Sequence, residues 1–160
     1  MEQVSEYRAL IVDDHEQTRT MVASILTEAG YDVREAGNGY RGIEMWATWK
    51  PSVVIADAEM PLMTGAQFGR VLRDLEKTLQ RRTALLMLTA HVDAEHAGAA
   101  LRAGFDAFLA KPLSAYSLCR AVFDVEERIR SERAQKSRHR LLPIHGEPPL
   151  GPRELGGLAS

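Results

Sequence analysis

The sequence predicts an α/β fold in which a parallel β-sheet carries helices on both faces. Short apolar runs alternate with segments of helical periodicity between residue 9 and about residue 130. Most of the apolar runs are continuous rather than alternating, which is typical of strands covered on both sides. The strand–helix order repeats five times, and right-handed crossovers between such units build a doubly wound sheet.

The expected strands are short and evenly spaced. Four are continuous apolar runs, and one alternates in the manner of an edge strand. In chain order they are ALIV (9–12), the alternating YDVREA (31–36), VVIA (53–56), ALLML (84–88) and AFLA (107–110).

Each strand is followed by a segment whose apolar residues recur at helical spacing. Gly30 and Gly104 stand where the first and fourth helices need a left-handed residue, and Thr64 with Gln67 has capping-box spacing. The fourth helix is expected from Asp93 to about Ala103. The inward-facing residues are expected to be Met21, Val22, Ile25, Leu26 and Ala29, then Ile43 and Trp46, then Phe68, Val71, Leu72 and Leu75, and finally Leu118, Val122, Val125 and Ile129.

Composition supports one domain with a real core. The chain has 160 residues, 45% of them hydrophobic, and a net charge of −2, which gives no bulk attraction to nucleic acid or to an acidic membrane. Residues 1–136 form the expected domain, and the Pro- and Gly-rich segment 137–160 is expected to be a flexible tail. The lone Cys119, the polar N-terminus and the lack of a run near ~18 apolar residues favour a cytoplasmic setting.

Polar side chains follow four of the expected strands at the point where each strand ends. Asp13 and Asp14 follow the first strand, Asp57 the third, Thr89 the fourth and Lys111 the fifth. In open α/β sheets ligands bind beyond the carboxyl ends of the strands. Three carboxylates, one hydroxyl and one ammonium should therefore converge on one edge of the sheet.

Clustered carboxylates repel one another unless a cation joins them. The strand-tip ligands are hard oxygens, which suits Mg²⁺. A carboxylate that attacks phosphorus, beside a divalent cation and a lysine that neutralise the phosphoryl oxygens, makes a phosphoryl-transfer site. Taken alone, Asp13 and Asp14 would serve equally well as a helix cap.

Four segments together resemble the receiver domain of bacterial response regulators, over residues from about 8 to 130. They are IVDDHE (11–16), VVIADAEMPLMTG (53–65), LLMLTAH (85–91) and AFLAKPL (107–113). The resemblance implies a flavodoxin-like sheet of strand order 2-1-3-4-5. It also implies a phosphorylation-activated switch of a two-component phosphorelay, which is not an enzyme beyond its own phosphoryl transfer and autodephosphorylation.

The same resemblance assigns a role to each acid at the site. Asp57 would be the phosphoacceptor. Asp14 and Asp57 would bind Mg²⁺ through their side chains, Asp13 through a metal-bound water, and Glu59 through its backbone carbonyl.

It also assigns roles to the last two strands. Thr89 would hydrogen-bond the phosphoryl group, Lys111 would pair with it, and Phe108 would change rotamer on activation. The bond from Lys111 to Pro112 is expected to be cis. The chain departs from the family's common pattern at Ala56, where an acid or a larger apolar residue is frequent.

The expected partners are a histidine kinase or a histidine phosphotransfer protein as donor, and an unknown downstream protein; a homodimer stays open. No nucleic-acid or membrane partner is expected, because the basic run RIRSERAQKSRHR (128–140) has no interleaved aromatic residue and is typical of a solvated helix end.

Two alternative functions remain at this point. One is a flavodoxin-like FMN carrier, which DDHEQT (13–18) disfavours because its acids repel phosphate; the other is an aspartyl-nucleophile phosphatase, which Glu59 superficially fits.

Glu59 and His91 lie two residues beyond Asp57 and Thr89, respectively. Since the strands that precede them end at the same edge of the sheet, both side chains should flank the direction from which water attacks an aspartyl phosphate. They are therefore expected to set the lifetime of the phosphorylated state, unless both are simply solvated loop residues.

Overall fold

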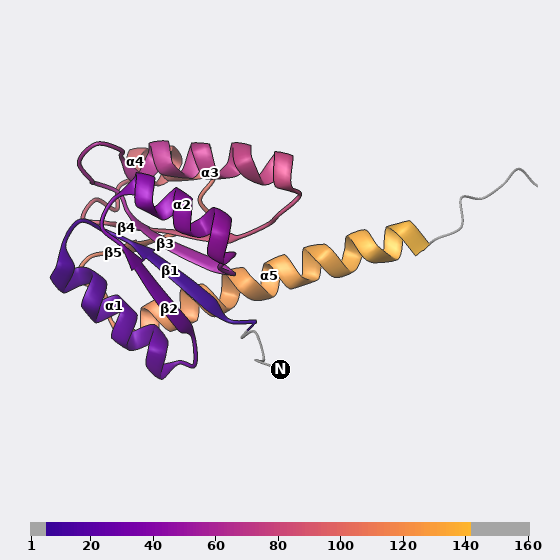
Figure 1. The fold of residues 1–160 in the computed structure, drawn as a ribbon, viewed down its shortest axis with the longest axis horizontal. Helices are drawn as coiled ribbons and strands as arrows, with labels where there is room; N and C mark the ends of the chain where they lie inside the picture. Colours follow the sequence, from indigo (N-terminus) through magenta and orange to yellow (C-terminus); the bar gives the residue numbers. More distant parts are fainter. Residues whose placement is uncertain (1–5, 142–160) are drawn as a thin grey trace, which may run out of the picture.

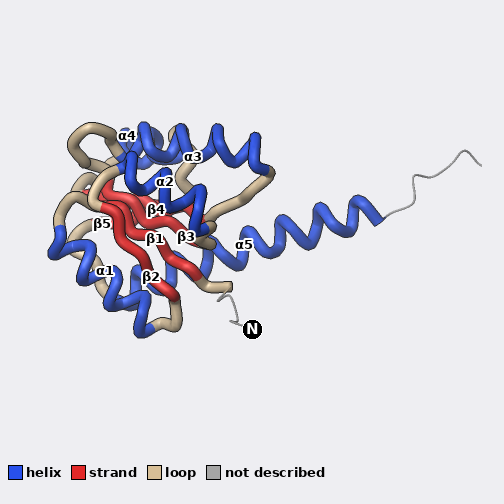
Figure 2. Tube along the Cα trace, viewed as in Figure 1, coloured by secondary structure: helices blue, strands red, loops and turns tan. Residues whose placement is uncertain are grey.

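The computed structural model describes residues 6–141, and these form three layers (Figure 1). A five-stranded sheet lies in the middle, with α1 and α5 on one face and α2, α3 and α4 on the other (Figure 2). The strands are β1 Arg8–Val12, β2 Asp32–Ala36, β3 Val53–Asp57, β4 Ala84–Thr89 and β5 Ala107–Ala110. The helices are α1 Glu16–Glu28, α2 Gly39–Trp49, α3 Gly65–Leu79, α4 Ala94–Arg102 and α5 Ala115–Leu141.

All strands run parallel in the order β2-β1-β3-β4-β5, which confirms the expected fold. β1, β3 and β4 occupy the middle, and their residues are buried almost throughout, as their continuous apolar runs predict. β2 is an edge strand, and its alternating sequence matches its half-exposed position. β5 forms the other edge and is only partly buried, although its sequence is apolar.

The helices bury the apolar faces that their periodicity predicts, with three exceptions. Trp46, Phe68 and Leu118 are fully buried against the sheet. Ala29 was expected to face inward, but it is exposed at the C-terminal end of α1. Met21 and Val71 were expected to face inward too, but they are 43% and 38% exposed, respectively. Both lie next to a fully buried residue on their helix, so they belong to the margin of an apolar stripe rather than to its centre.

Local signals at the helix ends also behave as predicted. Thr64 and Gln67 form a reciprocal capping box at the start of α3. Asp93 accepts a hydrogen bond from a backbone N–H in the first turn of α4. Gly30 and Gly104 have φ values of +97° and +94°, which only glycine adopts without strain.

Helix α5 runs to Leu141 and therefore enters the segment assigned to the tail. Its first part packs against the sheet through Leu118, Val122 and Ile129, and its second part projects away from the domain (Figure 1). The second part is polar on every side, as the basic sequence predicts for a solvated helix end. The expected flexibility of the rest of the tail concerns residues 142–160, which lie outside the described residues.

A buried ionic network joins α3, β4 and the start of β5, and no local sequence pattern predicts it. The Asp106 carboxylate accepts hydrogen bonds from the guanidinium groups of Arg73, at 2.9 Å, and of Arg82, and from the backbone N–H of Leu85 at 2.9 Å. Burial would raise the pKa of Asp106, but these hydrogen bonds and the two positive charges outweigh it and lower that pKa. Glu76 also pairs with Arg73, so the network is locally neutralised.

Within residues 6–141, none of the helices has the length and apolar character that a membrane crossing requires.

Candidate functional site

Topology brings the predicted site residues to one edge of the sheet. Asp13 follows β1, Asp57 ends β3, Thr89 ends β4 and Lys111 follows β5. Register keeps these strand ends level, because Val12 pairs with Ala36 and with Ala56, and Asp57 pairs with Leu88.

Asp57 is a buried acid with a cationic hydrogen-bond partner. It is 4% exposed, and its Oδ1 accepts a hydrogen bond of 2.7 Å from the Lys111 ammonium. Burial raises the pKa of Asp57 above its usual range; the hydrogen bond from Lys111 opposes this, and the neighbouring charge of Asp13 adds to it. The charged form of Asp57 is therefore costly in this site without additional positive charge.

Lys111 responds in the opposite sense to the same cluster. Burial would lower the pKa of its ammonium, but the hydrogen bond from Lys111 to Asp57 and the negative charges of Asp57 and Asp13 outweigh it, and the pKa is raised. The two shifts agree physically, because one ammonium is shared among several carboxylates. The Lys111 ammonium therefore stays protonated, but its single positive charge does not neutralise all of these carboxylates.

Asp13 and Asp14 each have a buried carboxylate oxygen that accepts no hydrogen bond from the described residues. Asp13 is fully buried, and its Oδ1 accepts the backbone N–H of His15 at 2.9 Å. Among the described residues, neither Asp13 Oδ2 nor Asp14 Oδ1 has a hydrogen-bond partner; the Lys111 Nζ lies 3.7 Å from Asp13 Oδ2, which is an ion-pair distance only. Buried carboxylate oxygens without partners are costly, so they indicate a place for a cation.

The donor set at this edge fits a hard divalent cation. Asp13, Asp14, His15 and Asp57 each offer a ligand atom, and these atoms lie within 4.8 Å of one another. Three of the four are carboxylates, which are the ligands that Mg²⁺ prefers. The acidic cluster expected from the sequence is therefore present.

Thr89 is buried at the end of β4 and pairs with the loop that follows. Its hydroxyl accepts the backbone N–H of His91 at 3.0 Å and donates to the His91 carbonyl at 3.1 Å. The Thr89 carbonyl accepts the backbone N–H of Lys111 at 2.8 Å, which ties β4 to the lysine. The hydroxyl therefore belongs to a local turn and would have to exchange these bonds to reach a ligand.

Three further predicted features are present in different surroundings. Phe108 lies in β5, partly buried against the core cluster that α2, α3 and α4 cover, and it pairs in register with Met87. Glu59 is highly exposed, and its Oε1 lies 3.5 Å from the Nε2 of His91. The Lys111–Pro112 peptide bond is cis, as the resemblance implied.

Two residues at the site were missed in the sequence. The side chain of His15 is 68% exposed, but its Nδ1 lies 3.2 Å from Asp14 Oδ1. Its place directly after two acids was the available signal. Gly65 begins α3 so close to β3 that a Cβ atom there would overlap the backbone carbonyl oxygen of Asp57. The Thr-Gly step that ends the Asp57 segment was the signal for this contact.

A family model described as the response regulator receiver domain matches residues 9–123. The chain belongs to this family. As a receiver domain of two-component response regulators, it is a phosphorylation-activated signalling module rather than a conventional enzyme.

Similar proteins agree with this membership. The receiver domain is 33% identical over 105 residues to the regulatory protein AtoC of Escherichia coli, covering 66% of this chain and 22% of AtoC. It is 29% identical to the chemotaxis protein CheY of Halobacterium salinarum, covering 74% of this chain and 95% of that protein. The solved structure of Vibrio cholerae chemotaxis protein CheY4 superposes with a TM-score of 0.70 at 30% identity, covering 74% of this chain and 98% of the other.

Sensor histidine kinases are among the similar proteins, together with regulatory and chemotaxis proteins. The chain spans only 22% of AtoC and 13% of the sensor histidine kinase RcsC of Salmonella typhi. In such proteins the receiver domain is one part of a longer chain.

Proposed function

We propose that this receiver domain accepts a phosphoryl group on Asp57 from a histidine kinase or a histidine phosphotransfer protein. It then signals to a downstream protein through contact with an altered surface. The proposed compartment is the cytoplasm, which the single cysteine supports. The observation that carries the proposal is the pairing of buried Asp57 with Lys111 beside carboxylate oxygens that have no hydrogen-bond partner.

The proposed step is a displacement at phosphorus. One Asp57 carboxylate oxygen attacks the phosphorus of a phosphohistidine; an O–P bond forms as the P–N bond breaks, and the departing imidazole nitrogen takes up a proton from solvent. Lys111 lies 2.7 Å from Asp57 and is placed to neutralise charge on the transferring oxygens. Ser or Thr could not replace Asp57 here, because an acyl phosphate preserves the high transfer potential that a reversible relay needs.

Asp13, Asp14 and Asp57 would hold Mg²⁺, with the backbone carbonyl of Glu59 as a further ligand. When bound, Mg²⁺ supplies the positive charge that draws a phosphoryl group to three carboxylates. Asp13 and Asp14 supply oxygen atoms that protein donors leave free, so they can serve as ligands without first breaking hydrogen bonds.

The modified site would redistribute two existing contacts. Lys111 now pairs with the Asp57 carboxylate, and it would pair with the phosphoryl oxygens once that carboxylate is phosphorylated. Thr89 now bonds to the His91 backbone, and it would give up these bonds to reach the phosphoryl group. Loss of the Thr89 turn would move the loop after β4 and vacate space at β5 for a new rotamer of Phe108, so that one covalent event changes a surface.

Neither earlier alternative gains support from the structure. An FMN carrier needs backbone donors for a phosphate after β1, and Asp13 and Asp14 occupy that place with negative charge. An aspartyl-nucleophile phosphatase would use Glu59 as a second acid near Asp57, but Glu59 is exposed and faces His91 instead.

Incubation with acetyl phosphate and Mg²⁺ tests the proposed acceptance of a phosphoryl group. Intact mass should show one added phosphoryl group on the wild type, and none when Mg²⁺ is chelated. Asp57→Ala should remain unmodified under the same conditions. Phosphorylation of Asp57→Ala to the wild-type level would overturn the assignment.

The pair of Glu59 and His91 is expected to control the lifetime of the phosphorylated state. Their side chains lie 3.5 Å apart at the mouth of the site, where they can obstruct or orient the attacking water. Single alanine variants should change the rate of phosphate loss by about tenfold or less, and the double variant should resemble the singles if the two act as a pair. The measurement is phosphate release from purified phosphoprotein in Mg²⁺ buffer free of transition metals. If the wild type, the two single variants and the double variant all lose phosphate at the same rate, Glu59 and His91 do not control the lifetime of the phosphorylated state.

A further inference from the structure

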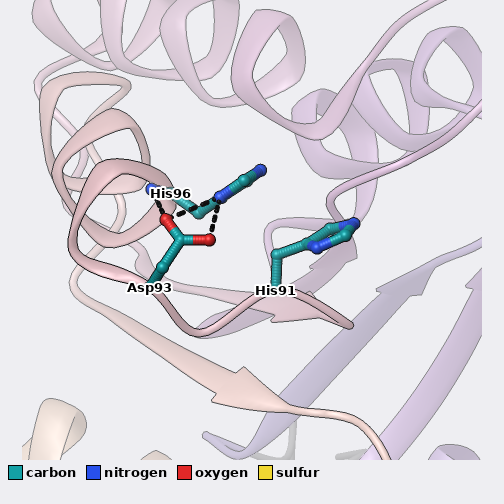
Figure 3. A group of neighbouring side chains, drawn as sticks. All are labelled: His91, Asp93 and His96. Carbon is teal, nitrogen blue, oxygen red and sulfur yellow. Dashed lines mark hydrogen bonds and ion pairs between the residues drawn. The ribbon is translucent and has the colours of Figure 1, made fainter.

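A second cluster of ligand-type side chains lies outside the acidic site. His91 follows β4, Asp93 caps α4, and His96 stands in the first turn of that helix (Figure 3). All three are exposed, and their ligand atoms lie within 4.8 Å of one another. Nothing in the proposed phosphoryl transfer uses Asp93 or His96.

Local structure fixes the spacing of this cluster. The Asp93 carboxylate accepts the backbone N–H of His96 at 2.9 Å, as the cap of α4, so the two side chains share one face of its first turn. The His96 Nδ1 also lies 2.7 Å from Asp93 Oδ2. A carboxylate and an imidazole are therefore already in contact before any ligand arrives.

His91 is brought to the same place by the turn after β4. The Thr89 hydroxyl holds both the N–H and the carbonyl of His91, which directs the following loop back toward α4. The rings of His91 and His96 stack with centroids 4.6 Å apart and an interplanar angle of 19°. A helix cap explains the contact between Asp93 and His96, but it does not explain a second imidazole stacked on the first.

We propose that His91, Asp93 and His96 bind a divalent transition-metal ion of the Zn²⁺ class. Imidazole nitrogens and a carboxylate are the ligands that Zn²⁺ takes, whereas Mg²⁺ prefers oxygen ligands alone. Metal–ligand bonds of about 2 Å require the three ligand atoms to draw together slightly, which exposed side chains allow. Glu59 lies 3.5 Å from His91 Nε2 and can supply the fourth ligand, or a water can.

The site is separate from the acidic cluster, but it adjoins the turn that Thr89 forms with His91. His91 forms a ligand and is also the backbone partner of Thr89. An ion bound here would tie the loop after β4 to the first turn of α4, which is the segment that the loss of the Thr89 turn would release.

Calorimetric titration of the full chain with Zn²⁺, in Mg²⁺ excess, tests the proposal. The Mg²⁺ occupies the acidic cluster, so that His15 is not counted with the second site. The wild type should bind one Zn²⁺ in this site. His91→Asn and His96→Asn should each weaken binding by about tenfold or more, since each removes one of three side-chain ligands. His139→Asn, on the exposed end of α5, should bind like the wild type.

Two further measurements keep the test decisive. Circular dichroism establishes that the variants remain folded, and histidine-ring NMR signals of the wild type should shift on Zn²⁺ addition at His91 and His96 but not at His139. The double variant His91→Asn/His96→Asn should bind no Zn²⁺ at this position. The proposal is overturned if the wild type binds no Zn²⁺ in Mg²⁺ excess, or if the double variant binds it with wild-type affinity.

Discussion

Replacement of Lys111 by alanine is expected to separate phosphorylation from its structural consequence. The variant should still become phosphorylated on Asp57, more slowly than the wild type, but the loop after β4 should no longer respond. The reason is that the ammonium now donates a hydrogen bond of 2.7 Å to the Asp57 carboxylate and, on the proposed mechanism, would pair with the phosphoryl oxygens after modification. Backbone amide NMR shifts of residues 89–96 report the response, and intact mass confirms that the compared samples are equally phosphorylated.

Stability distinguishes this role from a structural one. Lys111 is partly exposed at the sheet edge, and Mg²⁺ can replace its charge, so the free energy of unfolding in Mg²⁺ buffer should change by about 1 kcal/mol or less. Lys77→Ala is the matched control, because Lys77 is highly exposed and, among residues 6–141, forms an ion pair only with the exposed Asp74 in its own helix. Global unfolding of Lys111→Ala, or wild-type shifts in its fully phosphorylated form, would contradict the role.

Asp106→Asn is expected to cost about 3 kcal/mol of unfolding free energy at neutral pH. The side chain is almost buried, and the substitution preserves its shape while removing the charge that Arg73 and Arg82 share. The guanidinium groups of Arg73 and Arg82 would then lie against a neutral amide, with Glu76 left to pair with Arg73 and Glu132 with Arg82. Chemical denaturation at constant pH measures the difference.

The pH dependence of this difference has a definite sign. The pKa of Asp106 is lowered in the folded protein, so its ionised form contributes stability above the ordinary pKa of 3.8. That contribution is lost as the pH falls through the lowered folded-state pKa. The gap between wild type and Asp106→Asn should therefore be constant near neutrality and should narrow in acid below about pH 4.

Asp74→Asn makes the same chemical change on the surface of α3. Asp74 is exposed and, within the described part of the chain, forms an ion pair only with Lys77, at 3.5 Å, so loss of its charge should change the free energy of unfolding by about 0.5 kcal/mol or less. If the two substitutions cost the same, or if the cost of Asp106→Asn does not change with pH, the buried network does not stabilise the fold as described.

The parts of the fold that the sequence predicts are those that depend on local periodicity. Continuous apolar runs identify β1, β3 and β4 because both sides of these strands are covered, and capping residues such as Thr64 act within one turn of the chain. The positions of Asp57 and Lys111 follow from strand order, because every parallel strand ends at the same edge. The sequence therefore predicts which residues meet at the site.

What escapes prediction depends on contacts between distant segments. Asp106 and Arg73 are 33 residues apart, and no local pattern marks either as buried. Met21 and Val71 have the apolar character of core residues, but the angle at which each helix packs decides which margin of its stripe is covered. The Thr89 hydroxyl was expected to face a phosphoryl group, and in the structure it closes a turn with His91, a contact that only the path of the loop determines.

Peptide mapping of the phosphorylated protein tests the central claim most directly. Borohydride reduces an aspartyl phosphate to homoserine, so the modified residue is marked in the chain after treatment with acetyl phosphate and Mg²⁺. Homoserine should replace Asp57 alone, with Asp13 and Asp14 unchanged. Homoserine at Asp13 or Asp14 with Asp57 intact, or a stable phosphate on a Ser, Thr or His side chain, would contradict Asp57 as the phosphoryl acceptor.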